Sequence, residues 1–419
     1  MTQPDPGGRR DRTAWFLTLL FFGLGLLWLG TSFGASSSST DSASDTEEET
    51  ADEAGDADEA GDAEDPETSE VLAAQAAPPP PDRQDRFTIS ASGDIIVHER
   101  VGDAARIGEN TYNFDPLFAP VQNLIASRDF SICHLEVPIS STNQDLSFSN
   151  AAFRAPMELP AALKAAGFDS CSVASNHAWD SGASSVQSTI AQLNAVQLPH
   201  VGIADSAEGA AKNWQFNVLG NIIGHLSYTF GHNNPDEANG GVPEYAVSVI
   251  DEAAILADAA SQRAAGSEFV IVSLHWGDEF QNELNDQQAD LGPRLLASTD
   301  IDLIIGHHAH VPQRVEEING EYIAYGLGNL LSNQSASAPE CPTACTLDSQ
   351  DGVLLDFVVE RDANGALVVT QVVANPTWVD VGGTWKIIST DNPPVVGAEL
   401  DPTTLAESGQ RTRATLGVQ

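Results

Sequence analysis

Basic side chains are scarce in this chain, and lysine is almost missing. Lys and Arg together supply 18 of the 419 residues, against 60 Asp and Glu, and the formal net charge is −42 at pH 7. The three lysines are Lys164, Lys212 and Lys386. Because a field this negative repels polyanions, nucleic acid and anionic lipid surfaces are excluded as general partners.

Cysteine is also rare, with four residues and no CxxC pair that would indicate a structural zinc site. Cys341 and Cys345 lie in a Pro-rich loop, and their spacing predicts a short disulfide in an oxidising compartment. Cys133 and Cys171 lie in apolar runs, so we predict two buried, unreactive thiols.

Charge is absent from residues 14–33, an apolar run long enough to span a bilayer as a transmembrane helix. Arginines precede the run and acids follow it, which places residues 1–13 in the cytoplasm and the remainder outside. We therefore expect a single-pass protein of the cell membrane with an extracytoplasmic domain. The alternative is a cleaved signal peptide, which the length of the run and Phe33 at its end make the less favoured reading.

Residues 35–85 are predicted to form a disordered acidic and Pro-rich linker. The segment 41–70 holds acids and no bases, so it has little to bury and repels itself. The folded domain is predicted over 86–360, followed by a C-terminal extension over 361–419. Several Pro and Gly residues after Pro376 favour irregular or edge structure there.

Short apolar runs alternate with helical patterns along the folded domain, which predicts an α/β (α+β) fold with a mostly parallel core. The expected strands are 87–90, 95–97, 128–135, 168–174, 200–202, 221–228, 269–274, 301–305, 322–325 and 353–359. The expected helices are 159–167, 185–194, 251–265 and 287–297.

Polar side chains of metal-binding type follow the predicted buried strands. They are Asp94, Glu136, Asn176 with His177, His275, and His308 with His310. The loops beyond the carboxyl ends of strands in an α/β sheet are the usual ligand sites. Oxygen and imidazole donors that converge there are typical of a pair of divalent metal ions. Singly each has a plain structural explanation, such as a turn at Asp94 or a helix cap at Asn176. Their joint recurrence at strand ends favours a metal site.

The motifs also resemble those of a known family. In order they are SGD ending at Asp94, HLE ending at Glu136, SNHAWDSG at 175–182, LHWGDE at 274–279, IIGHHAHVPQ at 304–313 and AYGLGN at 324–329. This series resembles the CapA-type capsule synthesis family, a branch of the calcineurin-like metallophosphoesterases associated with poly-γ-glutamate capsules. The resemblance runs from about Phe87 to Val359. It implies a calcineurin-like double β-sandwich flanked by helices.

The resemblance also implies residue roles. Two divalent ions (Mn, Fe, Zn or Mg) would be held by Asp94, Glu136, Asn176, His275, His308 and His310. His177 would protonate the leaving oxygen or contact the phosphate, and Asp180 would orient it. Accessory positions are His98, His134, Glu279, His307 and Asn329, and Asn329 and Tyr325 would close the site from the last strand. Ile96 stands where related phosphoesterases have a histidine, so one ion lacks a ligand unless His98 or His134 supplies it.

Two functions remain open from the sequence. The first is a membrane-anchored, divalent-metal phosphoesterase-like hydrolase for capsule or envelope polymer synthesis and export, acting on a phosphoester or an anionic polymer. The second is a non-catalytic, metal-stabilised component that handles polymer inside an export complex. A secreted nucleotidase fits less well, because such enzymes carry a separate specificity domain that the segment after Val359 is too short to supply.

Overall fold

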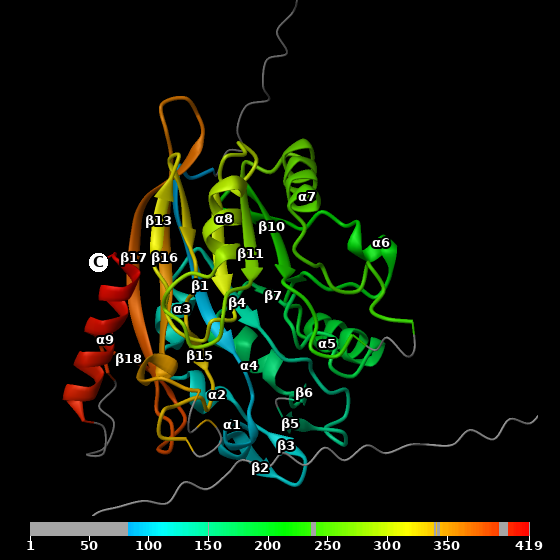
Figure 1. Cartoon of the computed structure of the whole chain (residues 1–419), viewed down its shortest axis with the longest axis vertical. Helices are drawn as coiled ribbons and strands as arrows, with labels where there is room; N and C mark the ends of the chain where they lie inside the picture. Colours follow the sequence, from blue (N-terminus) through cyan, green and yellow to red (C-terminus); the bar gives the residue numbers. More distant parts are fainter. Residues whose placement is uncertain are drawn as a thin grey trace, which may run out of the picture. The chain divides into compact units, whose positions relative to one another are not determined.

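The computed structural model describes residues 83–149, 151–235, 240–338, 341, 344–393 and 401–418. Two mixed β-sheets pack against each other through a shared hydrophobic core, and helices cover their outer faces (Figure 1). The mixed α/β class is therefore confirmed. The predicted transmembrane segment 14–33 and nearly all of the predicted linker lie outside the described residues. Among the helices of the described ranges, none combines the length and apolarity that a membrane span requires.

The larger sheet has eight strands, and its parallel half carries the first two site motifs. Strands β1, β4, β7 and β8 run parallel to one another, whereas β16 pairs antiparallel with β1 and β17 with β16. The sheet order is β18 (Ile387–Ser389), β17 (Leu367–Val379), β16 (Asp351–Arg361), β1 (Arg86–Ile95), β4 (Phe130–Leu135), β7 (Ser170–Ser172) and β8 (His200–Val201), and β15 (Asn329–Leu331) also pairs with β1.

The smaller sheet has six strands and carries the histidine motifs. Strands β10, β11, β12 and β14 are parallel, and antiparallel strands close both edges. The order is β13 (Val315–Ile318), β14 (Glu321–Ala324), β12 (Leu303–His307), β11 (Phe269–His275), β10 (Asn221–Thr229) and β9 (Gln215–Val218). Every residue of β11 and β12 is buried, as expected for parallel strands covered on both faces.

The core between the sheets follows the alternation of side chains along each strand. Phe87, Ile89 and Ala91 of β1 share one cluster with Phe269 and Ile271 of β11. Neighbouring residues of β11 point the other way, into a second cluster beneath helices. Because side chains of a strand alternate between faces, this packing fixes the register of the strands and so the position of the polar residue at each strand end.

Helices cover the outer faces and connect the parallel strands. Next to the larger sheet lie α1 (Glu99–Ala105), α2 (Asp115–Phe118), α3 (Gln122–Ala126), α4 (Leu159–Ala166) and α5 (Ala183–Ala195). The others are α6 (Ala207–Ala210), α7 (Glu252–Ala264), α8 (Asp286–Leu295), the 3₁₀ helix η2 (Leu347–Gln350) and α9 (Pro402–Leu416). Two antiparallel hairpins, β2 (Arg106–Gly108) with β3 (Thr111–Tyr112) and β5 (Ser147–Ser149) with β6 (Ala152–Arg154), complete the described elements.

The C-terminal segment is more regular than the sequence predicts. Strand β18 is the expected edge strand, but α9 was not expected, and Figure 1 shows it lying along β16 and β17. Asp401 caps the first turn of α9, and Pro402 stands at its first position. Arg411 of α9 donates to both carboxylate oxygens of the buried Asp351 at 2.7 and 2.8 Å. The segment 361–419 is thus largely built into the larger sheet, with α9 packed against it.

The four cysteines form two disulfides, Cys133–Cys171 and Cys341–Cys345. The prediction of free thiols at Cys133 and Cys171 is wrong for this structure. The two residues are direct partners on the neighbouring strands β4 and β7. Their Cα atoms are 4.4 Å apart, within the range found for disulfide-bonded cysteines. Their separation of 38 residues hides this proximity in the sequence.

Candidate metal centre

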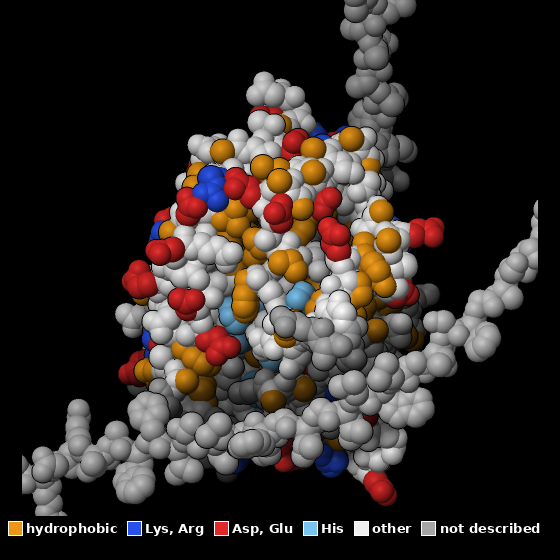
Figure 2. Space-filling view, turned by 45° about the vertical axis from the view of Figure 1, so that its right-hand side comes forward, with side chains coloured by type: hydrophobic (Ala, Val, Ile, Leu, Met, Phe, Trp, Pro, Cys, Tyr) orange, Lys and Arg blue, Asp and Glu red, His pale blue; other side chains and the backbone are white. Residues whose placement is uncertain are grey.

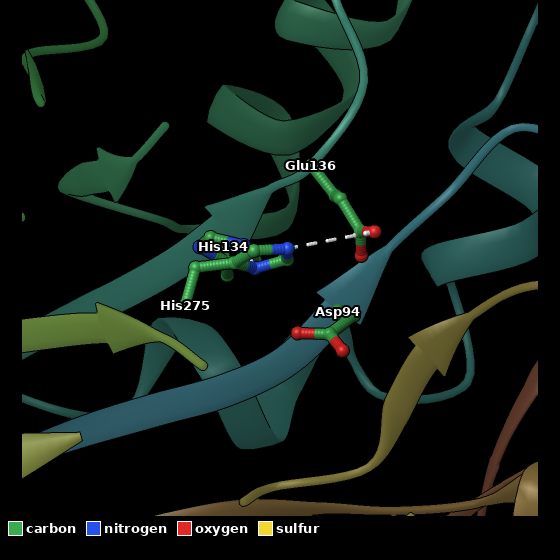
Figure 3. Close-up of side chains that lie close together, drawn as sticks. All are labelled: Asp94, His134, Glu136 and His275. Carbon is green, nitrogen blue, oxygen red and sulfur yellow. Dashed lines mark hydrogen bonds and ion pairs between the residues drawn. The ribbon is translucent and has the colours of Figure 1, made fainter. Parts of the chain in front are cut away.

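The carboxyl ends of β1, β4, β11 and β12 bring buried carboxylates and imidazoles together. Two sets of side chains each place one candidate ligand atom within 4.8 Å of the others. We call them the Asp94 group (Asp94, His134, Glu136 and His275; Figure 3) and the His308 group (Glu136, His308 and His310). Glu136 belongs to both, which is the arrangement expected of a carboxylate that bridges two ions.

Asp94 is the most heavily contacted member of the cluster. Its Oδ2 accepts from the backbone N–H of His308 at 3.1 Å and lies 3.0 Å from His310 Nδ1, while its Oδ1 lies 3.3 Å from His307 Nδ1. Burial alone would raise the pKa of Asp94, but hydrogen bonds from His307 and His310 hold it well below the usual value. Asp94 is therefore an ionised carboxylate in the middle of the histidines.

Glu136 has the opposite environment. Its carboxylate is buried, and its Oε1 lies 3.8 Å from His275 Nε2 and 3.7 Å from His310 Nε2. Burial raises the pKa of Glu136 well above its usual value, and the neighbouring carboxylates of Asp94 and Glu279 raise it further. A buried carboxylate that is expensive to ionise without a cation is suited to holding one.

Two polar residues, His134 and Ser172, line up behind His275 of the Asp94 group. Its Nδ1 lies 2.9 Å from His134 Nε2, and His134 Nδ1 lies 2.8 Å from the Ser172 hydroxyl. On the other side, His275 Nε2 lies 2.9 Å from Asn176 Oδ1. Burial lowers the pKa of both imidazoles well below the usual value, so they are neutral, as metal ligation requires.

The two imidazoles of the His308 group come from one irregular loop that follows β12. His308 and His310 both adopt positive φ angles, 87° and 56°, which are uncommon for residues with a Cβ atom. Just before this turn, Gly306 of β12 lets the backbone of Tyr325 approach closely, since a Cβ there would lie 1.8 Å from the backbone oxygen of Tyr325. The loop backbone therefore stores strain while it turns the two imidazoles toward Glu136.

The donor set fits divalent metal ions. Glu136 Oε2 and His308 Nδ1 are buried and have no hydrogen-bond partner within the described residues. Burial of such polar atoms without partners is costly, and a coordinated cation would satisfy them. Mixed imidazole and carboxylate ligands suit first-row transition metals.

His177 and Asp180 form a separate pair beside these groups. His177 Nδ1 lies 2.8 Å from Asp180 Oδ2, and the same carboxylate accepts from the backbone N–H of Phe153 and from the Asn234 side chain. The other ring nitrogen, Nε2, lies 3.4 Å from Asn233 Nδ2. Asp180 thus fixes the orientation of the imidazole and leaves Nε2 directed toward Asn233.

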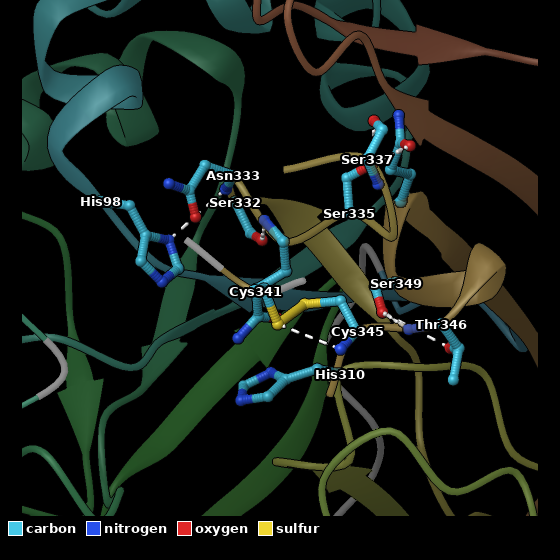
Figure 4. The surroundings of a disulfide bond; sticks show 12 residues. His98, His310, Ser332, Asn333, Ser335, Ser337, Cys341, Cys345, Thr346 and Ser349 are labelled. Atoms are coloured by element: carbon cyan, nitrogen blue, oxygen red, sulfur yellow. Dashed lines mark hydrogen bonds between the residues drawn. A yellow bond between two sulfur atoms is a disulfide. The ribbon is translucent and has the colours of Figure 1, made fainter. Parts of the chain in front are cut away.

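His177, Glu136 and His310 all line one cleft of about 570 Å³. Figure 2 shows histidine side chains inside a hollow of this face, between apolar side chains. The Cys341–Cys345 disulfide borders the cleft through Cys341, and His98 and His310, drawn with it in Figure 4, line the same cleft. A molecule bound in this cleft would contact His177 as well as Glu136 and His310 of the metal-binding groups.

The accessory residues predicted from the sequence have different positions. His307 contacts Asp94 and stacks on His134 with ring centroids 3.9 Å apart, and Glu279 lines the cleft. His98 also lines the cleft, but its Nδ1 accepts from the backbone N–H of Asn333, and neither metal-binding group contains it. Asn329 is buried and donates to the backbone oxygen of His310.

Tyr325 does not close the site, contrary to the sequence-based expectation. Its hydroxyl bonds to Glu316, and its ring stacks on Trp276. Two residues that the sequence reasoning passed over do reach the site, both from the loop after β10. Phe230 packs against His308 with ring centroids 4.6 Å apart, and Asn233 contacts His177. The position of this loop directly after a buried strand was the available signal.

These features define a protein of the mixed α/β class with a buried carboxylate–histidine centre. Residues 88–334, more than half of the chain, match the family model described as bacterial capsule synthesis protein PGA_cap. The chain belongs to this family.

Two named relatives agree with the match. The PGA biosynthesis protein CapA of Bacillus subtilis is 26% identical over 297 residues, which is 69% of this chain and 72% of the relative. The capsule biosynthesis protein CapA of Bacillus anthracis is 26% identical over 260 residues, which is 60% of this chain and 61% of the relative.

Solved structures show weaker similarity. The NAD nucleotidase of Haemophilus influenzae gives a TM-score of 0.43 at 13% identity and covers 80% of this chain and 64% of that structure. The calcineurin-like phosphoesterase YfkN of Bacillus subtilis gives a TM-score of 0.43 at 14% identity. The match covers 79% of this chain and 97% of that structure. Similarity at this level carries no information about activity.

Proposed function

We propose that this protein is a divalent-metal phosphoesterase-like hydrolase that acts in the synthesis or export of a capsule or envelope polymer. The family description and the names of the two CapA relatives support the polymer role. One observation carries the catalytic part. His177, which Asp180 orients, lines the same cleft as His310 and as Glu136, the residue that both metal-binding groups share. A purely structural metal site would have no use for an oriented imidazole at its edge.

We assign the ions to Glu136 and its neighbours, with Asp94 and His275 on one side and His308 and His310 on the other. Such an ion pair supplies an activated water and a clamp for a phosphate group. The chain itself supplies the proton. Asp180 accepts from His177 Nδ1–H, so a proton carried on His177 Nε2 is directed into the cleft, where it can pass to the leaving oxygen.

We assign His134 as a positioning residue for His275. Ser172 lies 3.4 Å from the backbone oxygen of Cys133 as donor, so its oxygen can accept from His134 Nδ1–H. For the metal-bound protein we assign the tautomer in which His134 Nε2 accepts from His275 Nδ1–H, which leaves the lone pair of His275 Nε2 available to an ion, 2.9 Å from Asn176 Oδ1. Two lone pairs at this distance repel each other unless a cation lies next to both. Asn176 is thereby included among the proposed ligands.

We also propose that residues 14–33 anchor the protein in the cell membrane, with the folded domain outside. The proposal rests on the uncharged run and the arginines before it. Membrane fractionation followed by external protease should release an intact folded domain. A soluble protein with a new N-terminus near Ala35 would instead indicate a cleaved signal peptide.

The direct test of the hydrolase proposal combines metal analysis of the full-length protein with a panel of phosphoesters. We expect about two ions per chain, as a two-metal site requires, and metal-dependent release of alcohol. The second candidate is a non-catalytic component that handles polymer, and the acidic character of the chain limits what it could bind without metal or salt. Full metal occupancy without hydrolysis of any ester would favour this candidate.

A further inference from the structure

The cleft beside the metal-binding groups continues past them. On the His177 side it is the cleft of about 570 Å³, which is lined by the rings of Phe148, Phe153 and Phe280. A second hollow of about 370 Å³ is lined by His308 of the metal-binding groups and by Phe230, Asn285 and Gln287 among others. Asn233 and Glu279 border both spaces. A phosphate held at the metal-binding groups therefore has room for a substituent on each side.

Apart from histidines, the ionisable residues that line these two spaces are acidic. The described residues that line them include Glu99, Asp278 and Glu279 as well as Glu136, and none of them is Lys or Arg. Arg154, which follows the cleft-lining Phe153, is paired with Asp145. In Figure 2 the Lys and Arg side chains lie away from the visible histidines. A bound phosphate would thus meet no Lys or Arg from the described lining, so its charge would be balanced only by the ions at the metal-binding groups and by a protonated histidine, and any further negative charge would be opposed by the carboxylates.

We propose that the substrate is a phosphodiester, which carries one negative charge and a group on both sides, rather than a terminal phosphomonoester, which carries nearly two. This inference rests on the proposed hydrolase function and adds the substrate class. In the reaction, water forms one new P–O bond and releases one proton to the solvent, which later reprotonates His177, and one ester P–O bond breaks. The leaving alcohol lies in the Phe-lined cleft and takes its proton from His177, and the phosphomonoester product remains on the side of Phe230.

The charge of the expected product also favours a phosphodiester substrate. Hydrolysis converts a monoanionic ester into a monoester that approaches a dianion near neutral pH. The base-free lining opposes this extra charge, which favours release of the product. A site built for terminal phosphates would ordinarily carry Arg or Lys to pair with them.

The test compares bis(p-nitrophenyl) phosphate with p-nitrophenyl phosphate at pH 8, using the full-length protein with its metal content measured. We expect kcat/KM to be at least about tenfold higher for the diester, a difference of roughly 1.4 kcal/mol. The double variant Glu99→Gln with Glu279→Gln should raise kcat/KM for the monoester. The ratio of the diester value to the monoester value should therefore fall at least threefold. Glu208→Gln with Glu109→Gln makes the same charge change outside both spaces and should leave the ratio unchanged.

Binding gives a readout that does not need turnover. Titration calorimetry should show tighter binding of methyl phenylphosphonate, a monoanion, than of phenylphosphonate, and the Glu99 and Glu279 double variant should reduce the difference. A preference for the monoester and for phenylphosphonate, or a ratio that the double variant leaves unchanged, would overturn the inference. If neither ester is hydrolysed by metal-loaded protein, the hydrolase function fails, and the two phosphonates still decide the charge preference of the cleft.

Discussion

The two metal-binding groups share Glu136 but are built in different ways. The Asp94 group takes its side chains from the ends of regular strands, and His134, His275 and Ser172 form a fixed row behind it. The His308 group takes both of its imidazoles from one loop whose backbone adopts positive φ angles at His308 and His310. Register of the sheets thus positions the first group, and local backbone strain positions the second.

This difference affects what supports each group. A disulfide lies directly under the Asp94 group, since Cys133 precedes His134 in β4 and Cys171 precedes Ser172 in β7. The disulfide near the His308 group lies in the loop that borders the cleft. We expect the Asp94 group to persist in metal-free protein and the His308 loop to relax.

Loss of Glu136 should have the largest effect, because it removes the one residue that both groups contain. Glu136→Ala is expected to abolish binding of both ions, whereas His308→Ala should lose the ion of its own group only. Metal content per chain, measured after dialysis, distinguishes these outcomes. Retention of a full ion by Glu136→Ala would mean that the two groups do not share a bridging carboxylate.

Buried histidines outside the two groups should make metal-free protein sensitive to acid. Burial lowers the pKa of His200 to about 4 and of His225 to about 3, against 6.5 for an exposed histidine. Between pH 6.5 and these values the unfolded chain binds a proton that the folded chain does not, so stability falls as the pH falls. Each residue should cost about 2 kcal/mol between pH 6.5 and 5.

Urea unfolding of metal-free protein at these two pH values measures the effect. His200→Gln should flatten the pH dependence of the unfolding free energy by about the same 2 kcal/mol. An unchanged slope in this variant would show that folding does not lower the pKa of His200. The pH dependence that remains in this variant shows how much of the acid-induced loss of stability comes from other residues, including the imidazoles of the two groups.

Loss of the Cys341–Cys345 disulfide should have a smaller effect. The bond spans 4 residues, and the chain-entropy model gives such a short loop about 2 kcal/mol of stabilisation. Cys341→Ser with Cys345→Ser should therefore lower the unfolding free energy by about 2 kcal/mol without changing metal binding by the Asp94 group. Mass spectrometry of unreduced protein should first show both disulfides, and two free thiols at Cys341 and Cys345 would reject this part of the account.

Loss of Ser172 should have the smallest effect and should be confined to the Asp94 group. Ser172→Ala removes the partner of His134 Nδ1 and leaves His275 less firmly oriented, so metal affinity should fall about tenfold. Ser170→Ala is the matched control, because Ser170 is equally buried in β7 and its hydroxyl has no hydrogen-bond partner within the described residues. Equal metal affinities in the Ser172→Ala and Ser170→Ala variants would contradict the assignment of His134 as the residue that positions His275.

The sequence predicted the strand-end positions well because the buried strands are strongly apolar. Asp94, Glu136, His275 and His308 all follow runs whose two faces are covered, so their convergence followed from the α/β pattern alone. The role of His134 was harder to predict, since it depends on the register of β4 with β7 and on the packing of one sheet against the other.

Other features had little or no local signal. Helix α9 carries few apolar residues and is held chiefly through tertiary contacts such as Arg411 with Asp351, so its amphipathic pattern is weak. The Cys133–Cys171 bond required knowledge of strand order. Phe230 and Asn233 reach the centre only because β10 neighbours β11, which no short-range pattern specifies.

The most direct test of the account is His177→Ala, assayed for metal content and for phosphoester hydrolysis in the same preparation. His177 is in neither metal-binding group, so metal content should remain at the wild-type level. Hydrolysis should fall by roughly 10²–10⁴, the usual loss when a positioned proton donor is removed. Asp180→Asn should give a smaller loss in the same step, because Asp180 only orients the ring. Undiminished hydrolysis in His177→Ala at full metal occupancy would contradict the catalytic assignment.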